Sequence, residues 1–305
     1  MKITTQLLLD LRTALQAAFS KGMQTAETVY QLFCSVIPSN SAKNTYPDLS
    51  QWPEFRKWVG PRQFKNLSAK GYSIENETFE ASVEVKREDI EDDNLGVSAH
   101  IAEASGVAAK VLPDELVAKL IADAHTELCY DGKPFFSADH LGKYTGDDVN
   151  GDPVFAAQSN IIGDPTKPLV AVLMDTTKPF KPFIVQPRRD FALTAKFNAN
   201  DDNVFHNNVF QYGSDGRIGA GYGPWQCAVA IHETLTPETY AQARARLGGF
   251  VGDSGRLLGT RGTMLLVGTA QETAAFELLN ADKIGNGKSN IWKGTAKLVI
   301  NPYMQ

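Results

Sequence analysis

The short motif that comes nearest to a catalytic pattern is Gly252-Asp253-Ser254-Gly255, which matches the tetrapeptide around the nucleophile of serine proteases. A serine nucleophile needs a histidine base and a carboxylate beside it. No upstream histidine lies at a small-residue strand end of the required kind, and Arg256 stands where glycine usually follows. The motif therefore predicts a polar turn. A hydrolase that uses Ser254 stays as an alternative from a different class.

Two other groups of residues have the chemistry of binding sites. The glycine-rich run 219–223 precedes a predicted strand, so it lacks the helix N-terminus that would hold a phosphate. Asp139-His140, His206 and His232 carry metal-binding groups but share no ligand spacing. We therefore predict no catalytic residue, no cofactor and no metal, and we do not expect an enzyme.

The composition is that of an ordinary globular protein. The 305 residues are 43% hydrophobic and 21% charged, and the formal net charge is −5. This balance gives no bulk basicity for nucleic-acid binding, although a weakly acidic protein could enclose DNA without condensing on it. The three cysteines are far apart, which favours a reducing compartment over a disulfide framework. No apolar run approaches the ~20 residues of a membrane span.

The sequence also predicts the helices and strands that would position these residues. Apolar spacing predicts an amphipathic helix over residues 3–19 and a short helical segment over 26–36. A helix over residues 97–125 would be ~40 Å long and would form the spine of its domain, with Pro113 as a kink or a second helix start. Residues 129–168 are rich in loops. Later strands are predicted at 169–174, 182–187, 209–213, 226–232, 264–268 and 296–303, with helices at 236–247 and 272–279.

Residues 54–94 predict a long, narrow β-hairpin. The second arm alternates, with Phe79, Ala81, Val83 and Val85 on one face, which is the pattern of a half-buried strand. The first arm, at 62–66, is polar and only weakly typical of a strand. Because an isolated two-stranded ribbon is marginal in water, this hairpin needs a surface to lie on.

The two arms of the predicted hairpin differ in charge. The first carries basic residues and the second, with its exit, carries a run of glutamates and aspartates. Opposite charges on paired strands stabilise the hairpin, and they also offer a surface that a neighbouring copy could complement. The pattern fits either an ordinary surface hairpin or an arm that lies on another subunit.

Several blocks, taken together in chain order, resemble the major head subunits of Mu-like tailed phages and prophages. These blocks are Trp52-Pro53-Glu54-Phe55-Arg56, Gly60-Pro61-Arg62, Tyr72-Ser73-Ile74, Val83 to Asn94, Cys129-Tyr130-Asp131-Gly132, Lys181-Pro182-Phe183-Ile184-Val185-Gln186, Gly221-Tyr222-Gly223-Pro224-Trp225-Gln226, Ser289-Asn290-Ile291-Trp292 and Asn301-Pro302-Tyr303. They cover nearly the whole chain, and their joint order is more specific than any single block.

The resemblance implies an α+β protein with the Hong Kong 97-like capsid fold. It implies an N-terminal arm (1–50), an extended hairpin called the E-loop (51–95), a peripheral P-domain (96–235) with a spine helix and a long sheet, and an axial A-domain (236–305). It also implies self-assembly into hexamers and pentamers, which form the icosahedral head shell around double-stranded DNA. The subunit would be part of the virion and would be assembled in the host cytoplasm.

The resemblance also implies the partners of the chain. The E-loop would lie on a neighbouring subunit, and the contact residues expected there are Arg62, Lys65, Lys70, Phe79, Val83 and Val85. A separate scaffold or protease, a portal and a decoration protein are the other expected partners, and no membrane is involved. No residue matches the asparagine of the covalent crosslink found in some members of the wider fold, so no crosslink is expected. An encapsulin-like compartment shell of the same fold is the alternative function.

Overall fold

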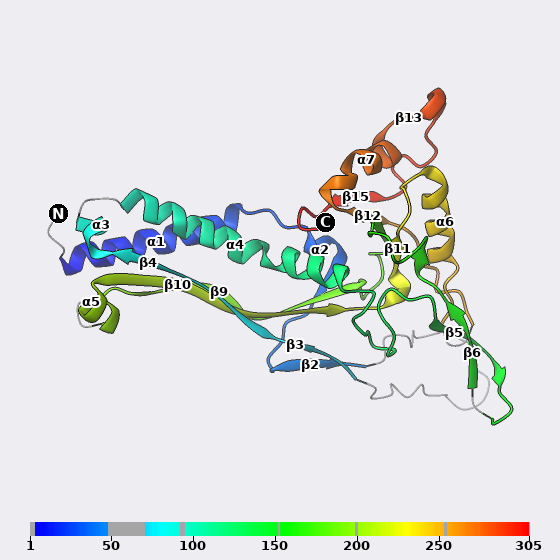
Figure 1. Ribbon diagram of the computed structural model, residues 1–305, viewed down its shortest axis with the longest axis horizontal. Coiled ribbons are helices and arrows are strands. Elements are labelled where there is room, and N and C mark those ends of the chain that lie inside the picture. Colours follow the sequence, from blue (N-terminus) through cyan, green and yellow to red (C-terminus); the bar gives the residue numbers. More distant parts are fainter. Residues whose placement is uncertain are drawn as a thin grey trace.

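The computed structural model describes residues 4–47, 71–91, 95–151, 153–198, 201–252 and 255–304. A long slab of two helices on a sheet leads into a second unit built on a separate sheet (Figure 1). Arg62, Lys65 and Lys70 lie outside the described residues, and so do Asp253 and Ser254.

Two long helices form one layer of the slab. Helix α1 (Thr5–Thr25) begins at Thr4, whose hydroxyl accepts a hydrogen bond from the Leu7 amide, and it runs beside α4 (Leu95–Ala122) (Figure 1). The spine helix predicted at 97–125 is confirmed to within three residues at each end, and Pro113 lies inside it. The shorter helices are α2 (Tyr30–Phe33), α3 (Arg87–Glu91), α5 (Asp202–Asn207), α6 (Pro237–Gly248) and α7 (Glu272–Asn280).

The other layer of the slab is a four-stranded sheet in the order β1-β9-β10-β4. Its strands are β1 (Cys34–Val36), β9 (Phe183–Lys196), β10 (Val209–Tyr222) and β4 (Glu77–Lys86). Strand β1 pairs parallel to β9, and the other pairs are antiparallel. Both β9 and β10 have 14 residues, so each is much longer than the apolar run from which it was predicted.

The structure corrects one part of the predicted hairpin. Residues 77–86 form a strand, as the alternation predicts, but this strand (β4) pairs with β10 in the long sheet. The two strands that flank residues 48–70 are β2 (Lys43–Tyr46) and β3 (Tyr72–Glu75), which pair antiparallel (Figure 1). The alternation of β4 shows which face is apolar but does not identify a pairing partner, and the actual partner lies far away in the sequence.

The second unit contains a five-stranded sheet in the order β15-β12-β8-β11-β7. Its strands are β7 (Ile161–Ile162), β8 (Ala171–Met174), β11 (Ala228–Ile231), β12 (Met264–Val267) and β15 (Lys297–Ile300). The expected boundary at residue 235 would divide this sheet, because β8 and β11 precede it and β12 and β15 follow it. The chain therefore enters the second unit, returns through β9 and β10 to the slab, and then enters the second unit again.

The segment 129–168, expected to be mostly loop, contains a projecting hairpin of β5 (His140–Asp147) and β6 (Pro153–Gln158) (Figure 1). Its register shifts between Leu141 and Tyr144 and again before Gly146, which explains why the alternation is hard to read in the sequence. A small pair, β13 (Lys283–Ile284) and β14 (Lys288–Ser289), completes the strands. Short 3₁₀ turns among the described residues are η1 (Trp225–Cys227), η2 (Thr269–Gln271) and η3 (Gly285–Gly287).

Three apolar clusters hold these layers together. The slab cluster lies between the helices and the sheet and includes Leu15, Phe19 and Phe210. The largest cluster joins the C-terminal end of α4 to the five-stranded sheet. A small third cluster lies under β2 and β3 and contains Tyr46 and Ile74. In the part of the chain that the structure describes, no helix is both long and apolar enough to cross a membrane.

Candidate functional site

A buried glutamine anchors β2 and β3 to the long sheet. Gln186 of β9 is fully buried, and its Oε1 accepts a hydrogen bond from the Tyr46 hydroxyl at 2.8 Å. Its Nε2 donates to the carbonyl of Ile74 at 2.8 Å and to Oδ1 of Asn76 at 3.0 Å. Since a buried amide that loses its partners costs free energy, this network fixes the position from which residues 48–70 leave the slab.

Asn76 extends the network to the turn before β2. Its Nδ2 donates to the Ser39 hydroxyl at 2.8 Å and to the Ser41 carbonyl at 2.9 Å. The guanidinium of Arg217 donates to the Asn76 carbonyl at 2.9 Å. Asn76 lies between β3 and β4, so these bonds hold the point at which the chain passes from the hairpin base into the long sheet.

The glycine-rich run 219–223 allows β3 to pack closely across the end of β10. A Cβ on Gly219 would be 2.3 Å from the Glu75 carbonyl oxygen, and a Cβ on Gly221 would be 2.4 Å from the Ile74 side chain. The Tyr72 hydroxyl accepts a hydrogen bond from the amide of Tyr222 at 2.9 Å. The run is therefore a close-packing surface for β3.

The predicted contact residues of β4 lie on the face that looks toward the helices. Val83 pairs with Tyr212 and Val85 with Phe210, and both valines pack on the slab cluster. Phe79 packs on the largest cluster. All three side chains are half-buried by their own chain. The opposite face of β4 presents Glu80 and Glu84, which are exposed.

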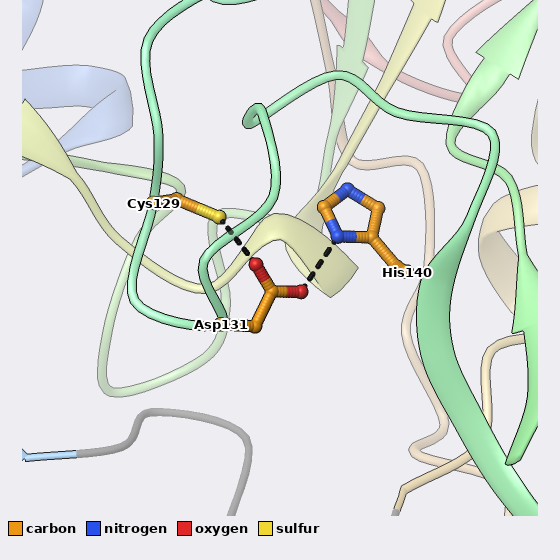
Figure 2. A group of neighbouring side chains, drawn as sticks. All are labelled: Cys129, Asp131 and His140. Carbon is orange, nitrogen blue, oxygen red and sulfur yellow. Dashed lines mark hydrogen bonds and ion pairs between the residues drawn. The ribbon is translucent and has the colours of Figure 1, made fainter. Parts of the chain in front are cut away.

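A cluster of three side chains resembles a metal site or a catalytic triad (Figure 2). One donor atom from each of Cys129, Asp131 and His140 lies within 4.8 Å of the others. The Cys129 thiol donates to Asp131 Oδ1 at 3.1 Å, and His140 Nδ1 lies 2.7 Å from Asp131 Oδ2. His140 Nε2 is 3.1 Å from the Phe135 carbonyl oxygen, and the ring stacks on Trp225 at 4.0 Å.

The bonding in this cluster favours a structural role. Burial raises the pKa of the Cys129 thiol, and the neighbouring Asp131 raises it further. Burial alone would raise the pKa of Asp131, but hydrogen bonds and charge from His140, together with the Cys129 thiol, lower it overall. A thiol held protonated is a poor nucleophile and a poor metal ligand. The Asp131 carboxylate separates the thiol from the imidazole, so the two do not form a nucleophile–base pair.

The structure does not assemble the other imagined sites. His206 is in α5 at the far end of the slab, whereas His140 begins β5 in the second unit (Figure 1). Asp139 bonds to Lys133 and Ser137, and His232 Nδ1 donates to the Lys167 carbonyl. Asp253 and Ser254 lie outside the described residues, and the amide of Gly255 donates a hydrogen bond to the Gly252 carbonyl at 2.8 Å.

Sequence reasoning missed the residues that hold the hairpin base. A polar residue in the apolar run 182–187 is the one available signal for Gln186, because a buried amide in a strand needs a partner. Asp131 and His140 are nine positions apart and gave no such signal, since their contact depends on the path of the loop between them.

Comparison with known proteins decides the family. A family model described as "Mu-like prophage major head subunit gpT" matches residues 8–304. The chain belongs to this family. It is 38% identical over 308 residues to the major capsid protein of Escherichia phage Mu, with all of both chains covered. It is 35% identical to the Mu-like prophage FluMu major head subunit of Haemophilus influenzae, over 97% of this chain and 98% of that protein.

Solved structures show the same relationship for the fold. A chain from the procapsid of bacteriophage JBD30 has a TM-score of 0.83 and 35% identity, and covers 99% of this chain and 100% of that one. A chain from the JBD30 capsid has a TM-score of 0.77 and 26% identity, with both chains fully covered. The predicted Hong Kong 97-like capsid fold and the predicted role as a major capsid protein are confirmed. The protein is a major head subunit of a Mu-like phage and a component of the virion capsid, and the encapsulin alternative is not favoured.

Proposed function

We propose that copies of this subunit form hexamers and pentamers, which close into an icosahedral shell around double-stranded DNA. The full-length similarity to the chain of the JBD30 procapsid, with a TM-score of 0.83, carries this proposal. Closed symmetry also explains how individually weak contacts add up to a stable particle. The net charge of −5 fits a shell that encloses DNA without condensing on it.

In this proposal, the chain is divided into the domains of the capsid fold. The N-terminal arm (1–50) contributes α1 to the slab, and the E-loop is the segment between β2 and β3 rather than the whole of 51–95. The P-domain is the slab of α1, α4 and the four-stranded sheet, and the A-domain is the five-stranded sheet with α6 and α7. The sheet order supports this division over a single boundary at residue 235.

The proposed contact between subunits joins the basic E-loop to an acidic strand edge. Arg62, Lys65 and Lys70 belong to the E-loop and lie outside the described residues. Glu80 and Glu84 are exposed on β4, which forms one edge of the long sheet. An edge strand leaves backbone groups unpaired and ready to accept a neighbour. Phe79, Val83 and Val85 would contribute only the part of their surface that α1, α4 and the sheet leave exposed.

The remaining partners and the absence of catalysis are also part of the proposal. A separate scaffold or protease, a portal and a decoration protein would complete assembly, without covalent crosslinks between subunits. Cys129 and His140 are buried and both bond to the half-buried Asp131, which supports a chain without an active site. Ser254→Ala should leave shell formation unchanged, and any esterase or protease activity in the preparation that fell with this change would contradict the proposal.

Native mass spectrometry of the purified chain, expressed alone and with a candidate scaffold, tests the proposal. We expect masses of six and five subunits, and larger closed assemblies when the scaffold is present. A chain that stays monomeric under both conditions and over a wide range of salt would contradict it.

A further inference from the structure

A pocket of about 280 Å³, lined by apolar side chains and by polar ones such as Arg12 and Asn198, opens at the end of the slab farthest from the second unit. Its floor contains Phe197, Val204 and Phe210, which are buried members of the slab cluster. Leu8 of α1 forms one wall, and Leu9 at the rim is 51% exposed. An apolar cavity of roughly 150 Å³ is already large enough to hold benzene, so this pocket has room for a phenyl ring.

The same end of the slab carries an exposed phenyl ring. Phe205 of α5 is 76% exposed, the largest exposed fraction of any aromatic side chain among the described large hydrophobic residues. It packs edge-on against His206, with ring centroids 5.1 Å apart. A large apolar side chain in this position exposes surface that association would remove from water.

Phe205 does not fill the pocket of its own chain. Val204 contributes to the pocket floor and is buried, and the next residue of a helix points about 100° away because a turn has ~3.6 residues. The ring and the pocket therefore face different directions on one subunit. Such a pair of surfaces makes a head-to-tail contact between copies, which repeats around a closed particle.

Charges around the two surfaces are complementary. Arg12 and Arg87 line the pocket, and Asp202 is exposed in the first turn of α5, one helical turn before Phe205. An acidic group beside the ring would meet the arginines of the accepting copy. Complementary charge directs encounter and fixes the orientation of a contact.

We propose that Phe205 of one subunit inserts into the pocket between α1, α5 and the long sheet of a second copy. This contact rests on the proposed self-assembly of the chain. It lies at the opposite end of the slab from the A-domain, so it would join subunits through their P-domains. A buried aromatic anchor in an apolar pocket is the usual composition of an interface hot spot.

Disulfide trapping between separately prepared variants tests the contact. One preparation carries Phe205→Cys, and the other carries Asn198→Cys, an exposed position at the pocket. The natural Cys34, Cys129 and Cys227 are buried. Shells assembled from the mixture should give a disulfide-linked dimer on a non-reducing gel. Because each subunit has one new cysteine, a mixed dimer must join two copies.

The control replaces Phe205→Cys with Phe276→Cys. Phe276 lies on α7 and is 56% exposed, and its cysteine variant should give no dimer with Asn198→Cys. A test dimer no stronger than the control would overturn the proposal.

A second measurement separates this contact from self-assembly as a whole. Phe205→Ser should raise the subunit concentration at which shells form by about thirtyfold, the effect of a hot-spot residue, while the melting temperature of the single subunit stays unchanged. Asp202→Arg should impair assembly, and Arg12→Asp in the same chain should restore it. If the wild-type chain forms shells and the Phe205→Ser chain forms them equally well, the proposed contact is overturned and the proposed self-assembly stands. No shells from the wild-type chain would overturn both proposals.

Discussion

Gly22 and Gly106 lie opposite each other where α1 crosses α4. A Cβ on Gly22 would be 2.1 Å from the Glu103 carbonyl oxygen, and a Cβ on Gly106 would be 2.1 Å from the Phe19 carbonyl oxygen. Real Cβ atoms do not approach backbone this closely. The two helices of the slab therefore pack through glycine on both sides, and this contact ties the N-terminal arm to the spine helix.

Gly106→Ala tests the crossing. Alanine should gain ~1 kcal/mol of helix propensity, but the clash with the Phe19 carbonyl should reverse the sign, since overpacking costs about 1–3 kcal/mol. We expect a net loss in the free energy of unfolding, measured by chemical denaturation. Gly248→Ala is the matched control, because its Cβ would be 3.7 Å from the nearest atom, the Thr260 carbonyl oxygen. Equal effects of the two changes would contradict the close crossing.

Gln186→Ala tests the anchor of the hairpin base. The change leaves the Tyr46 hydroxyl and the Ile74 carbonyl without their buried partner, and an unsatisfied buried group costs about 1–3 kcal/mol. We expect faster amide hydrogen exchange in β2 and β3, with β12 unaffected. Gln211→Ala removes a half-buried glutamine from the same sheet, one that bonds to the exposed Glu84, and should have little effect on β2 and β3. Unchanged exchange in β2 and β3 would show that Gln186 does not hold them.

The contact between His125 and His232 should make the folded protein less stable in mild acid. Their rings are 4.7 Å apart, and the Nε2 atom of each is buried without a hydrogen-bond partner. Burial, and then the charge of His232, lowers the pKa of His125 below 6.5. The unfolded chain therefore binds the proton more readily, so this contribution to stability is complete above pH 6.5 and is lost as the pH falls through the folded-state value.

Thermal melts of the single subunit between pH 7.5 and pH 5, a window set around the ordinary pKa of 6.5, measure this effect. His125→Phe removes the titrating group and keeps a ring, so the melting temperature should fall less steeply with acid than in the wild type. His100→Gln changes an exposed histidine and should keep the wild-type slope. An unchanged slope in His125→Phe would exclude the histidine pair as the cause.

Charge reversal on β4 tests the proposed contact with the E-loop. Glu80→Lys with Glu84→Lys would place positive charge where the basic E-loop of a neighbour is proposed to lie, and like charges across an interface oppose association. We expect weaker shell assembly at low salt and partial recovery at high salt, because salt screens exposed charges. Glu238→Lys with Glu272→Lys, at the starts of α6 and α7, is the control for a change in net charge alone. The same loss in both double variants would argue against the contact.

Much of the fold follows from local pattern, and the errors have one cause. Helices α4 and α6 appear close to their predicted ends. Strand β9 runs far beyond its apolar segment, because its second half alternates between the slab cluster and solvent. Strand β10 continues past 209–213 through polar residues and glycines, which carry no apolar pattern. The partner of β4 and the return of the chain between the two sheets depend on contacts between distant residues, which no local pattern specifies.

The candidate site was less predictable than the fold. The sequence singled out Phe79, Ala81, Val83 and Val85 as one apolar face. Phe79, Val83 and Val85 pack on apolar clusters of their own chain, whereas Ala81 is exposed. The pocket proposed to accept Phe205 combines residues of α1, α3, α5 and two strands, so it exists only after folding. Phe205 carries no sequence signal that distinguishes it from a core phenylalanine, because exposure depends on which side of α5 meets the slab.

The central claim is that copies of this chain build the shell of a phage head. Cryo-electron microscopy of particles from the purified protein, expressed with a candidate scaffold, measures this directly. We predict closed icosahedral shells in which the five-stranded sheets surround the axes of hexamers and pentamers and the slabs meet at their far ends. A monomeric protein, or open aggregates without capsomers, would contradict the claim.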